Sequence, residues 1–259
     1  MRKTRLYNAS KPLAAGFNIK ITDGDFDYLT KVMRKKIGDD IFVFNGLDGE
    51  WRTKILNIEK KNLTLLVEEK IFNQTRSSPI ALAFAPVKNV RIDFVAAKAT
   101  EMGVGKFAPI ITHHSVVDKI NEERFAANIK EACEQCERND MPQILPTKKL
   151  EKFLHEVGIF DNNQKSSKQN EEKILILCDE SGLGEKASIM LPKILGNKKE
   201  IIILIGPEGG FSKEEFAMMR NIKNLYSMSL GKRILRSDTA IIAALALVNE
   251  FIDFSLIAF

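Results

Sequence analysis

Short, almost continuously apolar segments recur along the last two thirds of the chain, and segments of helical spacing separate them. The apolar segments are IALAFAP at 80–86, KFAPIIT at 106–112, LILC at 175–178, IIILIG at 201–206 and LYSMSL at 225–230. A strand without a polar side must be covered on both faces, which is typical of parallel sheets flanked by helices. The pattern therefore predicts an α/β domain built on a parallel sheet.

Helices are expected between and after these strands. Helical spacing covers VRIDFVAAKATEM at 90–102 and residues 121–138, and further helices are predicted to begin near Ser212 and near Asp238. The last one contains TAIIAALALV at 239–248, ten residues where a membrane span needs ~20, so a buried helix is expected. The opening MRKTRLYNAS lacks the apolar core of a signal peptide, and we expect a cytoplasmic protein.

The first 75 residues have a different pattern. Apolar and polar residues alternate over 41–45, 49–59 and 62–71, with turns rich in Gly and Asn between these runs. This pattern predicts a small β-meander or barrel. Residues 25–36 have helical spacing and precede the strands, and the polar stretch 73–79 is predicted to be a linker.

The positive charge is concentrated in this first part. Residues 1–78 hold 15 Lys plus Arg against 10 Asp plus Glu, whereas residues 79–259 hold 24 of each. A basic module joined to a neutral one suggests a reader of polyanions attached to a part that performs chemistry. An ordinary solvated lysine surface is the alternative that charge alone leaves open.

Two of the three cysteines form a CEQC sequence, which raises the question of a metal or redox site. Cys133 and Cys136 fall within the helix expected at 121–138, so both thiols are predicted to lie on one helix face and to pack in the core. His113 and His114 are the available additional ligands, but as adjacent strand residues they would point to opposite faces. We therefore expect no metal.

A glycine turn, GPEGGF at 206–211, follows one of the apolar strands. The region has neither GxxxxGK[ST] nor GxGxxG spacing, which disfavours a nucleotide phosphate. Pro207 fixes one backbone angle, and Gly209 and Gly210 permit unusual ones, so the turn exposes backbone groups to a ligand. Glu208 disfavours an anion and tolerates a cationic ligand.

The segments after the two glycine-containing turns are expected to begin helices. Ser212 and Glu215 have the spacing of a capping box, and Ser237 or Asp238 is predicted to cap the helix that follows LGKRILR at 230–236. Within this second loop, the apolar residues Ile234 and Leu235 are candidates for the wall of a flat aromatic pocket. Either segment alone is equally compatible with a plain strand-to-helix turn.

Together, LIGPEGGFSKEE at 204–215 and LGKRILRSDTA at 230–240 resemble the paired signature of the SPOUT methyltransferases. The resemblance is specifically to the bacterial family that methylates uracil N3 in small-subunit ribosomal RNA. KATEMGV at 98–104, EACEQCERNDMPQI at 131–144 and YLTKVMRKKIGDDIFVFNG at 28–46 also match, in the same order. The chain departs from the family at Ser237-Asp238, where Thr-Glu is common, and at His113-His114, where a Glu-Arg pair is common.

The resemblance implies a PUA-like RNA-binding β-barrel over residues 1–73 and a SPOUT α/β domain with a deep trefoil knot over 79–259. Residues 161–173 look like a mobile insertion loop. S-adenosylmethionine would bind within the knot, and the protein would form a homodimer that acts on small-subunit ribosomal RNA or on the assembled subunit. The implied cofactor-binding residues are Leu204, Ile205, Gly206, Pro207, Glu208, Gly209, Gly210, Leu230, Gly231, Ile234, Leu235, Thr239 and Ala240.

Methylation of uracil N3 requires removal of the N3 proton and stabilisation of the anion. Arg236 is the candidate for stabilisation, and Glu101 and Arg138 are candidates for orienting the base or handling its proton. Arg34, Lys35, Lys36 and Arg52 are the predicted phosphate contacts. Ribose 2′-O-methylation, a non-catalytic ribosome-assembly factor and a protein that depends on CEQC for metal or redox chemistry are the alternatives.

Overall fold

The computed structural model describes residues 3–9, 12–75, 77–87, 90–160, 172–178, 184–196 and 200–252. It forms two compact units. Of the described residues, unit 1 comprises those up to Ser77 together with Lys130–Met141, and unit 2 comprises those of Ser78–Ile129 and those from Pro142 onward. Of the insertion expected at 161–173, residues 161–171 lie outside the described part, and Lys173 begins a strand.

Unit 1 is built on a five-stranded sheet with the order β1-β3-β4-β5-β2. Its strands are β1 (Arg5–Tyr7), β2 (Asn18–Thr22), β3 (Asp40–Phe44), β4 (Glu50–Ile58) and β5 (Asn62–Phe72). Only β1 and β3 pair in parallel. The alternating residues predicted to face inward form one core, which includes Ile41, Val43, Ile55, Leu63 and Leu65. The predicted meander is therefore confirmed.

The helix of unit 1 is shorter than the 25–36 predicted. It consists of α1 (Asp23–Asp27) and a π-helical turn, η1 (Tyr28–Val32). Arg34 has a φ of 53°, a left-handed conformation that stops the helix, and the Lys35 amide donates back to the Leu29 carbonyl at 2.9 Å. The basic residues consequently follow the helix instead of forming its last turn.

Residues 130–141 were expected in the C-terminal domain but pack with unit 1. Hydrogen bonds from Arg5, which is 4% exposed, attach this segment to unit 1. Its guanidinium donates to the Cys133 carbonyl at 2.8 Å and to Asn139 Oδ1 at 2.5 Å, and it pairs with Glu50 at 3.4 Å. A buried guanidinium must satisfy its donors, and this segment supplies the acceptors.

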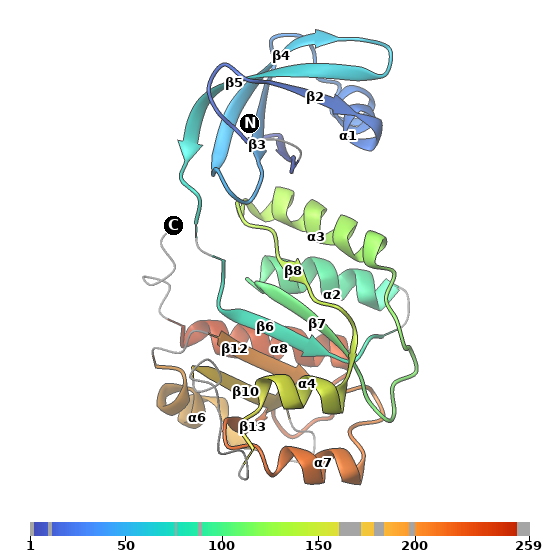
Figure 1. Cartoon of the computed structure of the whole chain (residues 1–259), viewed down its shortest axis with the longest axis vertical. Helices are drawn as coiled ribbons and strands as arrows, with labels where there is room; N and C mark the ends of the chain where they lie inside the picture. The colour runs from blue at the N-terminus through green and yellow to red at the C-terminus, as the bar shows by residue number, and fades with distance from the viewer. Residues whose placement is uncertain are drawn as a thin grey trace. The chain divides into compact units, whose positions relative to one another are not determined.

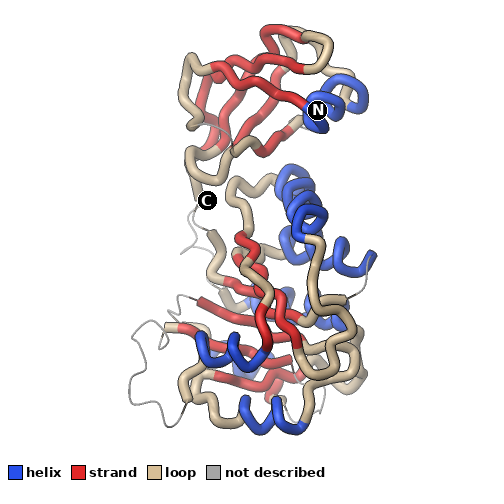
Figure 2. The backbone as a smooth tube through the Cα atoms, turned by 45° about the vertical axis from the view of Figure 1, so that its right-hand side comes forward, coloured by secondary structure: helices blue, strands red, loops and turns tan. Residues whose placement is uncertain are grey.

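Unit 2 contains the predicted parallel sheet (Figures 1 and 2). Its strand order is β11-β13-β10-β12-β6-β7-β8, with β9 beside β7. All of its described pairings are parallel. The strands are β6 (Ile80–Phe84), β7 (Lys106–Ile111), β8 (Gln143–Ile144), β9 (Lys148–Lys149), β10 (Lys173–Cys178), β11 (Glu185–Lys186), β12 (Glu200–Ile205) and β13 (Leu225–Ser229).

Helices cover both faces of this sheet, as near-continuous burial of the strands requires. They are α2 (Val90–Glu101), α3 (Glu122–Cys136), α4 (Leu150–Val157), α6 (Ala187–Ile194), α7 (Lys213–Met219) and α8 (Ser237–Glu250). Alternate strand residues such as Ala83, Leu177 and Leu204 share a core with α4 and α7. Figure 1 shows α4 in front of the sheet and α8 behind it.

The face behind the sheet is apolar as well. Phe84, Phe107 and Phe125 form an aromatic cluster with centroid separations of 5.1–6.4 Å. Helix α8 contacts β12 and buries Ile241 and Leu245, which confirms the predicted buried helix. Among the described residues, no helix combines the length and apolarity that a membrane span requires.

Candidate functional site

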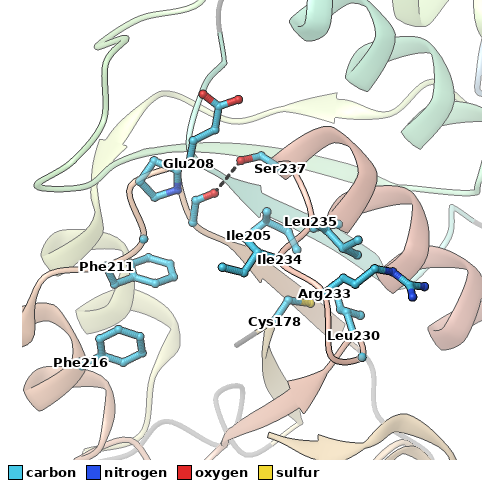
Figure 3. Close-up of a pocket in the computed structure, with 15 residues that line it drawn as sticks. Cys178, Ile205, Glu208, Phe211, Phe216, Leu230, Arg233, Ile234, Leu235 and Ser237 are labelled. Atoms are coloured by element: carbon cyan, nitrogen blue, oxygen red, sulfur yellow. Dashed lines mark hydrogen bonds between the residues drawn. The ribbon is translucent and has the colours of Figure 1, made fainter. Parts of the chain in front are cut away.

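A pocket opens at the carboxyl ends of three neighbouring strands, β10, β12 and β13 (Figure 3). In open parallel sheets, this edge is where ligands usually bind. The space within the pocket and its mouth is about 630 Å³. Its lining residues are Cys178, Ile205, Gly206, Pro207, Glu208, Gly210, Phe211, Phe216, Leu230, Gly231, Arg233, Ile234, Leu235, Ser237 and Ala240.

The first wall is the glycine turn after β12. The Gly210 amide donates to the Pro207 carbonyl at 2.9 Å, and Gly210 has a φ of 68°, which favours glycine. At Gly206, an added Cβ would lie 2.7 Å from Cε2 of the Phe211 ring. Glycine at this position therefore lets the phenyl ring pack directly on the backbone at the pocket wall.

The helix that follows the turn is capped as predicted. Ser212 accepts from the Glu215 amide at 3.2 Å, and the Glu215 carboxylate accepts from the Ser212 amide at 2.8 Å, so both halves of the capping box are formed. The capping box gives the Ser212 and Glu215 amides partners within the protein. These amides are therefore not available to bind an anion at the start of α7.

The second wall is the loop after β13, and it is bonded to the first. The N-cap of α8 is Arg236, without a side-chain cap, so the predicted capping by Ser237 or Asp238 is wrong. Ser237 Oγ donates instead to the Gly206 carbonyl at 3.1 Å, and Asp238 accepts from the Thr239 amide. The Ser237 bond, drawn in Figure 3, links the two loops across the pocket.

The pocket is apolar inside and charged at its margin. Phe211 and Phe216 stand on one side, and the carboxylate of Glu208 and the guanidinium of Arg233 point away from the apolar side chains (Figure 3). Burial raises the pKa of the Cys178 thiol, so the thiol stays protonated and lines the pocket as an uncharged side chain. Such a pocket fits a ligand with an apolar, flat part and charged ends.

Most of the cofactor-binding residues predicted from the two motifs line this pocket. Leu204, Gly209 and Thr239 do not: Leu204 is fully buried in the sheet core, Gly209 faces His114, and Thr239 is exposed. The prediction missed Cys178, Phe211, Phe216, Arg233 and Ser237. The available signal for Cys178 was its place at the end of an apolar strand.

The structure does not bring the predicted catalytic residues together within unit 2. Arg236 is exposed and lies between the pocket residues Leu235 and Ser237. Glu101 ends α2 and pairs with Lys98 at 2.8 Å. Asn249 donates to the Met102 carbonyl, so Glu101 lies near the far end of α8, about 20 Å along the helix from Arg236 at 1.5 Å per residue.

Arg138 belongs to unit 1, where it forms a two-bond ion pair with Asp140 at 2.9 and 2.6 Å. Its side chain is 13% exposed. Among the predicted phosphate contacts, Arg34 and Lys36 are exposed and Lys35 is half-buried, whereas Arg52 is paired with Glu68 at 3.5 Å and with Glu69 at 3.2 Å.

The cysteine and histidine expectations need two corrections. Cys133 is buried and its pKa is raised to about 12 by burial, but Cys136 is exposed, because α3 turns that position away from the core. His113 and His114 lie in a turn after β7, not in the strand, and their rings contact each other edge to face at 4.8 Å. The described residues contain no cluster suited to a metal ion.

Sequence comparison identifies the class of protein to which this fold and this pocket belong. A model of an RNA methyltransferase domain matches residues 74–249, and a model of an RNA methyltransferase PUA domain matches residues 21–68. The chain therefore belongs to this RNA methyltransferase family. The SPOUT fold class with a PUA-like N-terminal domain is confirmed, and the trefoil knot stays a prediction.

Comparison with individual proteins gives a more specific similarity within this family. The chain is 32% identical over 250 residues to ribosomal RNA small subunit methyltransferase E of Rickettsia conorii, covering 96% of each chain. A Legionella pneumophila protein, solved with bound S-adenosylmethionine, matches with a TM-score of 0.79 and 27% identity over 96% of this chain and 98% of that one. Methyltransferase E from Neisseria gonorrhoeae shares the fold, with a TM-score of 0.78, 24% identity, and coverage of 96% and 98%.

Proposed function

We propose that this protein transfers a methyl group from S-adenosylmethionine to N3 of a specific uridine in small-subunit ribosomal RNA. The observation that carries the proposal is the pocket at the ends of β10, β12 and β13, formed by both motif loops in a chain of the RNA methyltransferase family. The similarity to methyltransferase E of Rickettsia conorii supports the choice of ribosomal RNA.

The residues of the pocket fit this cofactor. Ile205, Ile234 and Leu235 offer apolar surface for the adenine. Gly206 has no side chain and packs closely on Phe211, so its backbone amide and carbonyl lie at the pocket wall. Glu208 and Arg233 supply opposite charges for the amino and carboxylate groups of the methionine part. S-adenosylmethionine supplies an electrophilic methyl group on a sulfonium when it is bound.

Arg236 is the proposed catalytic residue. N3 of neutral uracil carries a proton, and its loss leaves negative charge on the ring carbonyls, which an aimed guanidinium stabilises. The flanking residues Leu235 and Ser237 both line the pocket, which supports a place for Arg236 near the cofactor. A carboxylate or water must accept the proton, and we propose Glu101 for this role only as a residue of the partner in the proposed dimer, because in the same chain it lies about 20 Å from Arg236 along α8.

Arg138 and the basic residues of unit 1 complete the proposal. Arg138 is proposed to orient the base, although its bonds to Asp140 also give it a structural role. Arg34, Lys35 and Lys36 are proposed to contact phosphates, and Arg52 less so because two glutamates already neutralise it. N3 is on the pairing edge, so the target base must be unpaired or flipped out.

We also propose a homodimer in the cytoplasm, where ribosomal RNA is found. Helix α8 supports the dimer, because Ile242, Ala243 and Leu247 stay partly exposed on the sides that do not face the sheet. Phe94 on the contacting helix α2 is 45% exposed. Analytical ultracentrifugation of the protein and of Leu247→Glu measures this directly, with a monomeric variant expected.

The test of the reaction uses purified protein, labelled S-adenosylmethionine and small ribosomal subunits that lack the modification. The labelled nucleoside is then identified by mass spectrometry. We expect 3-methyluridine at one position. Label on ribose would keep the cofactor site and overturn the proposed chemistry, and RNA binding without any label would favour a non-catalytic assembly factor.

A further inference from the structure

The chain leaves β7 through a turn at residues 112–115 that is closed by its own bonds. The Thr112 amide donates to Ser115 Oγ at 2.9 Å, and the Ser115 amide donates to the Thr112 carbonyl at 3.1 Å. Because β7 is a buried strand of the sheet, this turn is a fixed point from which its two middle residues, His113 and His114, project.

The turn is bonded to the C-terminal end of the glycine turn that forms the first pocket wall, and to helix α7 that follows it. The His113 amide donates to Glu215 Oε1 at 2.8 Å, and the other oxygen of that carboxylate accepts from Ser212. His114 Nδ1 lies 3.1 Å from the Gly210 carbonyl oxygen. Since a carbonyl only accepts, Nδ1 must carry the hydrogen, and the imidazole donates to the glycine turn.

The imidazole contacts the part of the turn where two adjacent glycines lie. Gly210 adopts a φ of 68°, and a Cβ on Gly209 would lie 3.1 Å from the Cβ of His114, so histidine and turn are in close contact. Gly206, Pro207, Glu208 and Gly210 line the pocket, whereas His114 does not. The side chain therefore contacts the wall from outside.

We propose that His114 is a positioning residue for cofactor binding. By fixing the Gly210 carbonyl, it holds the turn in its binding conformation before the ligand arrives, so less ordering is required on association. The inference rests on the proposed function for the identity of the ligand, but it makes a separate claim about the free protein. It assigns to the histidine no contact with substrate or cofactor.

The experiment compares His114→Ala, His114→Asn and His114→Gln by calorimetric titration with S-adenosylmethionine. The amide nitrogen of Asn lies where Nδ1 lies, and that of Gln lies near the place of Nε2. We expect the Ala and Gln variants to bind about tenfold more weakly, equivalent to ~1.4 kcal/mol, and the Asn variant to bind within about twofold of the wild type. His113→Ala is the matched control: it removes the ring contact with His114 but keeps the backbone bond to α7 and the bond from His114 Nδ1 to Gly210, so it should bind normally.

Two further readouts separate positioning from general structure. At saturating cofactor, the Ala variant should keep its kcat and thermal midpoint while the KM for S-adenosylmethionine rises. Hydrogen exchange of residues 206–212 in the ligand-free protein should be faster in the Ala variant than in the wild type or the Asn variant. Normal binding by the Ala variant, or weak binding by the Asn variant, would overturn the proposal.

Failure of the wild type to bind S-adenosylmethionine would contradict the proposed function, and the exchange measurement would then decide the inference alone. Equal exchange rates in all variants would refute the role of His114, and selective acceleration in the Ala and Gln variants would support it.

Discussion

Gly206 shows how a single missing side-chain atom shapes the pocket. A Cβ there would lie 2.7 Å from the Phe211 ring, so the ring would have to move, and because it lines the pocket we expect it to narrow the pocket. We expect Gly206→Ala to weaken S-adenosylmethionine binding about tenfold, or ~1.4 kcal/mol. Calorimetric titration measures this, with Gly24→Ala as control, since a Cβ at Gly24 meets nothing within 4 Å. Unchanged binding would mean that the ring moves elsewhere.

Arg236 is the residue on which the proposed chemistry depends. Removing one aimed donor from a developing anion costs ~3–4 kcal/mol, so Arg236→Ala should lower kcat by a factor of about 10² to 10³. The KM for S-adenosylmethionine should change little, because Arg236 does not line the pocket. Its neighbour Arg233 does, and Arg233→Ala should mainly raise that KM. Steady-state kinetics distinguish the two, and equal kcat in both variants would remove Arg236 from the mechanism.

At this scale, the sequence predicts most of the contiguous parts of the site, although it missed Phe211, Arg233 and Ser237 within the same two motifs. The loops around Pro207 and Leu235 are motif residues, and they line the pocket. Cys178 and Phe216 reach the same pocket from other elements, so only the folded sheet reveals them. The bond from Ser237 to Gly206 was unpredictable for a related reason, because the sequence suggested a capping role for that hydroxyl.

At the scale of elements, Glu200 joins three strands. It begins β12 and pairs with Lys106 of β7 at 2.5 Å and with Lys173 of β10 at 3.3 Å. Burial by itself raises the pKa of Glu200, but the hydrogen bond and charge of Lys106, with those of Lys173, outweigh it and lower the pKa. The carboxylate therefore stabilises the fold above its unfolded pKa, near 4.5, and this contribution is lost as pH falls through the folded pKa.

Glu200→Gln should accordingly lower the free energy of unfolding by ~1 kcal/mol at pH 7. The difference from the wild type should stay nearly constant from pH 7 down to about 4.5 and shrink below it, as pH falls through the folded pKa. Urea unfolding monitored by circular dichroism at several pH values measures it. The exposed pair of Lys193 and Glu185 is the control, and Glu185→Gln should change little. A difference independent of pH would show that the Glu200 charge does not contribute.

Long periodic elements were predictable, and short or interrupted ones were not. The apolar runs of β6 and β12 indicated the parallel sheet, since strands of this kind between helices are typical of parallel sheets that are covered on both faces. Two-residue strands such as β8 carry no periodicity. The predicted end of the N-terminal helix was wrong because Arg34 adopts a left-handed conformation, which is uncommon for arginine and cannot be inferred from the residue type.

At the scale of the whole molecule, RNA affinity should depend on salt through the basic segment after η1. Replacing Arg34, Lys35 and Lys36 by Gln should flatten the slope of log K against log salt by about 2, at ~0.7 per single-strand phosphate contact. Arg52→Gln should leave it nearly unchanged because Glu68 and Glu69 already neutralise that charge. Titration of a small-subunit RNA fragment at several salt concentrations measures both. An unaltered slope in the triple variant would place the RNA on another surface.

The strand order also has a consequence for synthesis on the ribosome. β6 lies between β7, which follows it closely, and β12, whose Ile201–Ile205 pairs with Ile80–Phe84 about 120 residues earlier in the chain. At a rate of synthesis of ~5–20 residues per second, β12 is made roughly 6–24 s after β6. During this time, the edge and apolar surface of β6 that β12 later covers are exposed. The pocket needs β13 and α8, which emerge later still. A nascent chain thus acquires its binding site only after α8 has been synthesised, and products truncated before α8 cannot compete for cofactor.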